Sequence, residues 1–314
     1  MSPLPDRTAV EAAAARIAGH VRVTPVLALE RGAFGSDPAC QLALKLESLQ
    51  HAGSFKPRGA LNRVLAAGMP PAAGLIAASG GNHGAAVAWV ARLLGVRAEI
   101  FVPAIASPAK IRRLRDFGAM VHVGGADYSE ALAACEARRA ASGALAVHAY
   151  DDPDVVAGAG TLAREFEQQA GALDSVLVAV GGGGLLSGLL AWWGKRVRVI
   201  TVESAGCPTL HNALAAGRPV DIAVSGLVAD SLGARRIGVI GWQLVRRYPV
   251  TSLLVDDDAI RGAQHALWRD LRVVAEPGGA TALAALLSGA YRPAPGERVG
   301  VIVCGGNADL AALA

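Results

Sequence analysis

Short apolar runs alternate with longer amphipathic stretches along almost the whole chain. Runs such as SVLVAV (175–180) and VGVIVC (299–304) contain no charged residue, which is typical of strands buried on both faces beneath helices. We expect strands at residues 42–47, 75–79, 98–103, 120–124, 145–149, 175–181, 197–203 and 299–305. The helices expected between and after them cover residues 57–67, 83–94, 107–117, 127–142, 153–170, 184–193, 208–215, 234–247, 257–270 and 278–289.

This alternation predicts an α/β fold in which parallel strands are joined by right-handed crossovers. Residues 75–149 hold four expected strands with their helices, and the flanking segments hold enough strands for a larger sheet. We therefore expect a large domain of residues 1–74 and 150–314, a small domain of residues 75–149 inserted within it, and a cleft between them. Ligands of such folds bind at the carboxyl ends of the strands.

Several functional classes are excluded by composition. No apolar run approaches the roughly 20 residues that span a bilayer, and the N-terminal residues contain acids and bases without the apolar segment of a secretory signal. The four cysteines are scattered without a CxxC pair, which favours a reducing cytoplasm over a disulfide or zinc framework. We predict a cytoplasmic protein without a membrane partner.

The net charge of +4 does not indicate nucleic-acid binding. The basic residues are dispersed, and the aromatic residues, 4% of the chain, do not alternate with them. No stacking platform for bases is therefore visible, and we expect no nucleic-acid partner.

The chain contains only four lysines against twenty-six arginines, and one of them, Lys56, lies between Phe55 and a proline. Arginine stays protonated, whereas a lysine in a dry site can lose its proton and attack a carbonyl carbon. An ordinary surface lysine at the start of a helix would also fit this position.

Three glycine-containing segments directly follow expected strands: SGGNHG (79–84), VGGGGLLSG (180–188) and VIVCGGN (301–307). Four consecutive glycines before a helix predict a loop whose N–H groups hold a phosphate. The segment is not a Walker A loop and fits the dinucleotide fingerprint poorly. For residues 79–84 a plain turn is the alternative, and for Cys304 the alternative is a small buried apolar residue.

An amine, a phosphate cradle and a polar loop together indicate a cofactor that is both an aldehyde and a phosphate, and pyridoxal 5′-phosphate meets this description. The chain resembles the fold-type-II enzymes of this cofactor, in particular the serine/threonine dehydratase and serine racemase group. The resemblance rests on GSFKPRGALN, SGGNHG, AVGGGGLLSG and VCGGN, in order and spacing, together with VVAGAGTLARE and AEPGGATALAALL. It implies two αβα lobes of the tryptophan synthase β-like type.

The resemblance implies a role for each matching residue. Lys56 would bind the cofactor covalently and later act as the base on Cα, Phe55 would pack on the ring, and Asn82 would contact the phenolate oxygen. Cys304 would lie at the ring nitrogen. The phosphate would be held by Gly181, Gly182, Gly183, Gly184 and Leu185, and the substrate by Ser79, Gly81, Asn82, His83 and Tyr150.

Departures from the group distinguish its activities. Racemases of the group have a serine as second acid/base where this chain has Gly80, and they tend to have asparagine where it has Tyr150. Both differences favour dehydration. The group's cation site combines a glutamate like Glu203 with an aspartate six residues later, where this chain has Thr209, so we expect no metal. The segment 228–233 also differs from the group. We expect no regulatory domain after GGNADL (305–310).

We therefore predict a pyridoxal-phosphate-dependent dehydratase (ammonia-lyase) that converts L-serine, L-threonine or a related β-hydroxy amino acid to a 2-oxo acid and ammonia. The alternatives are an amino-acid racemase, a dehydratase of 3-hydroxyaspartate or phenylserine, and a non-catalytic protein that binds the cofactor or a nucleotide. The resemblance also implies a homodimer.

Overall fold

The computed structural model describes residues 3–35 and 40–309, which form two separate sheets with helices on both faces of each. The strands are β1 (Val26–Ala28), β2 (Gln41–Leu46), β3 (Leu75–Ala78), β4 (Ala98–Val102), β5 (Met120–Val123), β6 (Leu145–Ala146), β7 (Ser175–Ala179), β8 (Arg198–Ser204), β9 (Thr251–Val255) and β10 (Arg298–Val303). The α-helices are α1 (Arg7–Ile17), α2 (Lys56–Ala66), α3 (Asn82–Leu94), α4 (Pro108–Asp116), α5 (Tyr128–Ser142), α6 (Pro153–Ala170), α7 (Gly184–Trp193), α8 (Thr209–Ala216), α9 (Ala229–Leu232), α10 (Val239–Arg247), α11 (Asp257–Leu271) and α12 (Pro277–Leu287). Short 3₁₀ turns are η1 (Ala33–Gly35), η2 (Glu47–Leu49) and η3 (His51–Gly53).

The larger sheet has the strand order β1-β2-β10-β7-β8-β9. Its strands are parallel except β1, which pairs antiparallel with β2 at one edge. Helices α6 and α7 cover one face, and α12, with α11 packed on it, covers the other. Most residues of the central strands β10, β7 and β8 are apolar and buried because both faces of the sheet are covered, and Lys45 of β2 and Glu203 of β8 are buried charged exceptions.

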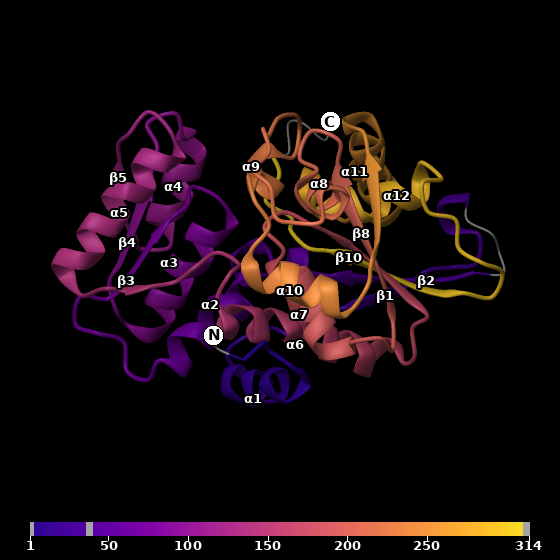
Figure 1. Ribbon diagram of the computed structural model, residues 1–314, viewed down its shortest axis with the longest axis horizontal. Helices are drawn as coiled ribbons and strands as arrows, with labels where there is room; N and C mark the ends of the chain where they lie inside the picture. The colour runs from indigo at the N-terminus through magenta and orange to yellow at the C-terminus, as the bar shows by residue number, and fades with distance from the viewer. Residues whose placement is uncertain (1–2, 36–39, 310–314) are drawn as a thin grey trace.

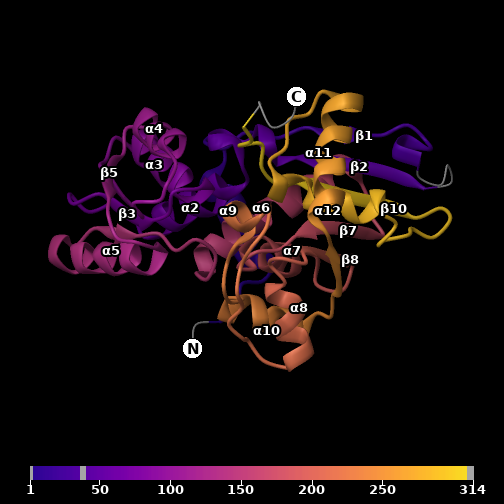
Figure 2. The same ribbon diagram turned by 90° about the horizontal axis from the view of Figure 1, so that it is seen from above.

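The smaller sheet, in the order β5-β4-β3-β6, is wholly parallel. Helices α3 and α4 pack on one face and α5 on the other. Figures 1 and 2 show this sheet and its helices at one end of the molecule, with α2 lying between them and the larger sheet. The α/β fold with two parallel-sheet lobes is thus confirmed.

The expected domain boundaries at residues 75 and 149 stay a prediction. The smaller sheet does lie within this range. Its apolar core, however, also contains Leu61 and Val64 of α2 and Val155 of α6. Helix α2 therefore links the packing of the two lobes.

Some expected elements were wrong in extent or were missed. The strand expected at 145–149 ends at Ala146, because the following residues turn toward the larger sheet, and the helix expected at 234–247 begins only at Val239. Strands β1 and β9 and helices α1 and α9 were not expected. β1 is only three residues long, so its pattern carries little signal. In the described part of the chain, no helix has the length and apolar character needed to cross a bilayer.

The parallel register of the larger sheet gathers three of the sequence motifs at one edge. Leu46 of β2 pairs with Val303 of β10, and Val301 of β10 pairs with Leu177 of β7. The carboxyl ends of these strands therefore lie side by side. The segments that follow them carry Lys56, Cys304 and the four glycines.

Candidate active site

Lys56 is the first residue of α2 and is held against the end of β10. The backbone N–H of Phe55 donates to the Cys304 carbonyl at 3.1 Å, and Ser54 forms a β-bridge with Gly305. The Lys56 amine donates to the Ala149 carbonyl at 2.7 Å. Burial lowers the pKa of Lys56 to about 8, although Cys304 and Glu276 oppose this effect. A lysine in this state supplies neutral amine near physiological pH.

The Phe55 ring lies next to this amine, with its centroid 5.1 Å from Nζ. The role expected for Phe55, packing on the cofactor ring, stays a prediction. The ring also packs against the core of the larger lobe. Phe55 therefore provides an apolar wall close to Lys56.

The four glycines form the turn between β7 and α7. Gly183 has a φ of +92°, a left-handed conformation that residues with side chains rarely adopt. A Cβ atom on Gly182 would lie 2.5 Å from carbons of the Tyr150 ring, so this loop tolerates no side chain there. Within the described residues, the N–H groups of 181–185 donate to no backbone carbonyl. Free N–H groups at a helix N-terminus form an anion site, so this loop fits a phosphate.

The polar loop after β3 leads into α3, with Gly81 before the first helical residue, Asn82. Asn82 is fixed from both ends of its amide: Nδ2 donates to Glu276 Oε1 at 2.5 Å, and Oδ1 accepts from Asn307 Nδ2 at 2.6 Å. The Ser79 hydroxyl accepts from the N–H of Gly81 at 3.3 Å. This loop presents an oriented amide and the start of a helix to the same region as Lys56.

The His83 side chain is buried in the small lobe and does not face solvent. Its Nε2 pairs with the Val147 carbonyl at 2.7 Å, and burial lowers its pKa to about 3. The imidazole is therefore neutral and already paired at one nitrogen. A contribution of His83 to anion binding would come from its backbone N–H at the start of α3.

Cys304 follows β10 and is buried. Its Sγ lies 3.4 Å from the Gly278 carbonyl, and burial raises its pKa to about 12. Cys304 is therefore a neutral thiol. Both sequence readings, a buried small residue and a group at the end of the strand, are compatible with this position.

Glu276 is a site residue that the sequence reasoning missed. The carboxyl group is buried, contacts Asn82, and has its pKa raised to about 7 by burial, against the lowering effect of that contact. A signal was available, because Glu276 is the only charged residue between positions 273 and 291. An isolated acid in a long apolar segment is seldom on the surface and needs a buried partner.

Glu203, at the end of β8, binds the start of α8. Its two carboxylate oxygens accept from the N–H groups of Leu210 at 2.7 Å and His211 at 2.8 Å. The Thr209 hydroxyl donates to the Ala234 carbonyl at 2.7 Å. Burial raises the pKa of Glu203 to about 7. Among the described residues, no three His, Cys, Asp or Glu side chains are grouped as a metal site.

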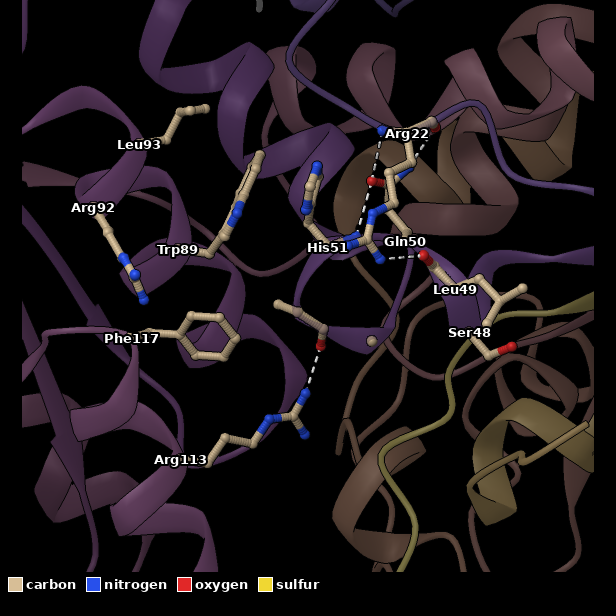
Figure 3. Close-up of a pocket in the computed structure, with 12 residues that line it drawn as sticks. Arg22, Ser48, Leu49, Gln50, His51, Trp89, Arg92, Leu93, Arg113 and Phe117 are labelled. Carbon is tan, nitrogen blue, oxygen red and sulfur yellow. Dashed lines mark hydrogen bonds between the residues drawn. The ribbon is translucent and has the colours of Figure 1, made fainter.

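A cavity of about 780 Å³ is lined in part by residues 48–53 and is drawn in Figure 3. The His51 and Trp89 rings stack across it with centroids 4.5 Å apart. Arg113 donates to the Ala52 carbonyl at 2.5 Å, and Asn307 donates to the same oxygen at 2.9 Å. None of the predicted site residues lines this cavity. Asn307, which also binds Asn82, connects the wall of this cavity to the candidate site.

Comparison with known proteins agrees with this geometry. Residues 17–305 match the family described as "Pyridoxal-phosphate dependent enzyme". The chain is 36% identical to a phenylserine dehydratase of Ralstonia pickettii, over 99% of this chain and 96% of that protein. It is 35% identical to an L-threonine ammonia-lyase of Geobacter sulfurreducens, over 96% of this chain and 76% of that protein.

The fold is similar to that of a solved structure as well. Maize serine racemase superposes with a TM-score of 0.91 at 31% identity, and the alignment covers 99% of this chain and 96% of that one. The matched range includes Lys56, the glycine loop and Cys304. The chain belongs to the family of pyridoxal-phosphate dependent enzymes.

Proposed function

We propose that this chain is an ammonia-lyase that dehydrates a β-hydroxy amino acid to a 2-oxo acid and ammonia. The observation that carries the proposal is that the Lys56 amine, with a pKa of about 8, binds the Ala149 carbonyl, and the next residue, Tyr150, packs on the glycine loop, whose N–H groups make no backbone hydrogen bond among the described residues. Its relatives include a phenylserine dehydratase and an L-threonine ammonia-lyase.

The cofactor site would be formed by residues from both lobes. Lys56 would hold pyridoxal phosphate covalently, Phe55 would contact its ring, and Asn82 would donate to its phenolate oxygen. Cys304, as a neutral thiol, would leave the ring nitrogen without a charged partner. The phosphate would be bound by the N–H groups of Gly181, Gly182, Gly183, Gly184 and Leu185. The cofactor supplies an electron sink for the pair left at Cα when a proton is removed there.

Lys56 would also act as the general base. Its Nζ, as a free amine, would take the Cα proton of the bound substrate. A base is most effective when its pKa lies near the working pH, and burial brings Lys56 into that range. The Ala149 carbonyl, 2.7 Å from Nζ, would hold the amine in place.

The substrate carboxylate would bind at the start of α3. The N–H groups of Asn82 and His83 make no backbone hydrogen bond to a described residue and lie at the helix N-terminus, where anions are favoured. Ser79 and Gly81 would complete this site. Tyr150, packed on the glycine loop, would contact the substrate side chain.

Gly80 favours dehydration over racemisation. Racemisation needs a proton donor on the face of Cα opposite the lysine, and glycine has no proton to give. A Cβ atom at this position would make only ordinary contacts, 3.6 Å from Val102. The backbone at Gly80 therefore leaves room for a Cβ atom, so a clash at Cβ is not the reason for glycine here.

A substrate screen would test the proposal. Purified protein loaded with pyridoxal phosphate should absorb in the visible range and release 2-oxo acid from one or more of L-serine, L-threonine, phenylserine and 3-hydroxyaspartate. Lys56→Ala should abolish both colour and product. Formation of D-serine without 2-oxo acid would favour the racemase alternative. A colourless protein that binds NAD or ATP would favour the non-catalytic one.

We also propose that the protein works in the cytoplasm as a homodimer. The scattered cysteines suit a reducing compartment, and the dimer is implied by resemblance to the serine/threonine dehydratase group. Light scattering coupled to gel filtration would test the dimer, and a mass of 31.9 kDa, that of one chain, would contradict it.

A further inference from the structure

The segment from Ala149 to Asp151 follows the last strand of the small lobe and lies against the glycine loop (181–184). The Ala149 carbonyl accepts from the Lys56 amine at 2.7 Å. The Tyr150 ring packs against Gly182. The Asp151 carboxylate accepts from the first two N–H groups of α10 at 2.9 Å each. Three consecutive residues therefore contact the amine, the glycine loop and a neighbouring helix, so a small change in this turn would reach all three.

The shape of this turn is held by His148. Its Nδ1 accepts from the backbone N–H of Tyr150 at 3.2 Å and from that of Asp151 at 2.8 Å. Its ring also meets the Tyr150 ring edge-on, with centroids 4.9 Å apart and an interplanar angle of 77°. One imidazole thus orients both the backbone and the side chain of the turn.

The hydrogen bonds to Nδ1 set the state of the imidazole. A nitrogen that accepts N–H groups carries no proton, so the ring is neutral and its proton is assigned to Nε2. Withdrawal of part of the ring from water lowers the pKa of His148. The carboxylates of Asp151, Asp152 and Glu136 act in the opposite direction, and the charge of Lys56 adds to the lowering.

We propose that His148 is a positioning residue, whose neutral imidazole shapes the turn that places the Ala149 carbonyl on Lys56 and the Tyr150 ring on the glycine loop. This inference rests on the proposed role of Lys56 and the glycine loop in holding the cofactor. The rival explanation is that His148 itself transfers a proton during the reaction. The two explanations differ in what they require: positioning needs only an acceptor at Nδ1, whereas proton transfer needs an imidazole.

Two substitutions separate these explanations. In His148→Asn the amide oxygen can take the place of Nδ1 as acceptor, but the side chain cannot exchange protons. In His148→Phe the ring edge against Tyr150 is kept and the acceptor is lost. We expect the Asn variant to stay close to the parent protein. The Phe variant should bind pyridoxal phosphate about tenfold more weakly and lose a similar factor in kcat, because two hydrogen bonds are removed.

The experiment titrates the apoprotein with pyridoxal phosphate, follows the visible absorbance to obtain Kd, and then measures kcat and KM. His211→Phe is the matched control. It also removes an imidazole with a hydrogen bond at Nδ1, to Ser252 at 3.1 Å, but on α8, and its Kd should stay within about twofold of the parent value. If the Phe variant does not fold, His148→Ala removes the acceptor without adding bulk and should show the same loss.

The outcomes decide the proposal. Retention in the Asn variant with loss in the Phe variant supports it. Equal losses in both variants overturn it in favour of proton transfer, and equal retention in both overturns it as well. Because the Kd needs no substrate, it reports on His148 even if every proposed substrate is inert. Failure of the proposed function would instead appear as inert substrates or as colour that survives Lys56→Ala.

Discussion

Replacement of Lys56 by methionine should stabilise the apoprotein at neutral pH. Burial lowers the pKa of this lysine from its ordinary value of 10.5 to about 8. The folded state therefore binds the proton less tightly than the unfolded state. Between about pH 8 and 10.5 the unfolded chain holds more protons, so the stability of the parent protein rises with pH across this interval. Below about pH 8, Lys56 is charged in both states, and folding moves this charge into a buried environment that disfavours it.

The magnitude follows from the two pKa values. Each pKa unit between the two values corresponds to 1.36 kcal/mol, so the charged Lys56 lowers the free energy of unfolding by about 3 kcal/mol. This is an upper limit because the side chain retains some contact with solvent. Methionine removes the charge at nearly the same length but loses the hydrogen bond to Ala149, which costs about 1 kcal/mol. We expect a net gain of about 1–2 kcal/mol at pH 7 and almost none at pH 10.

The assay is urea unfolding of the two apoproteins at pH 7 and pH 10. The difference between parent and variant removes the contributions of all other titrating groups, since both proteins share them. Lys45→Met is the matched control, because Lys45 is also buried but pairs with Glu165 at 2.6 Å. Its loss leaves a carboxylate without this partner and should destabilise by about 3 kcal/mol or more. The reasoning is refuted if Lys56→Met is no more stable than the parent at pH 7, or if the difference does not change with pH.

Three further predictions concern the glycine loop, Glu276 and Glu203. Gly183→Ala should weaken pyridoxal phosphate binding about tenfold and cost about 1–2 kcal/mol in urea unfolding, because φ is +92° and the new Cβ would lie 2.6 Å from Ile237. Gly262→Ala, which meets open space within α11, should instead stabilise by about 0.5–1 kcal/mol, and equal effects would contradict the argument. Glu276 has a pKa raised to about 7, so stability falls as pH rises from about 4.5 to 7; Glu276→Gln should flatten that dependence in thermal melts, and an unchanged slope would disprove its source. Dialysis against EDTA should leave activity intact because both oxygens of Glu203 bind α8, and stimulation by Mg²⁺ would show the reverse.

The sequence predicted those elements whose residues show a clear local pattern of apolar and polar positions. Strands β3, β4 and β7 are buried along their whole length and are apolar apart from Glu99 and Ser175, and their bounds lie within two residues of the expected ones. β9 is partly exposed, and β1 pairs at an edge, so neither has the continuous apolar run that identifies a buried strand. Helix α9 is four residues long, which is too short for a helical period to be visible.

The candidate site was predicted where a residue type itself restricts the chemistry. A lysine in an arginine-rich chain and four consecutive glycines are unusual locally, so each could be recognised before its neighbours were known. Glu276 belongs to the candidate site because its carboxyl group binds Asn82, which lies 194 positions away along the chain. His148 belongs to it because the turn that its imidazole holds also contains Ala149, whose carbonyl binds the Lys56 amine. The isolated acid indicates that Glu276 is buried, but neither its partner Asn82 nor the proximity of the His148 turn to Lys56 has a signature in local spacing.

The sequence by itself determined which chemical groups are available: an amine that can lose its proton, a loop without side chains, and a thiol at the end of a strand. The tertiary structure decided what those groups become. Burial, a property of the packed lobes, lowers the pKa of Lys56 and raises that of Glu276. The parallel register of β2, β10 and β7 brings segments distant along the chain to one edge. Solvent exclusion and distance in space depend on the whole chain, and therefore no single segment could show them.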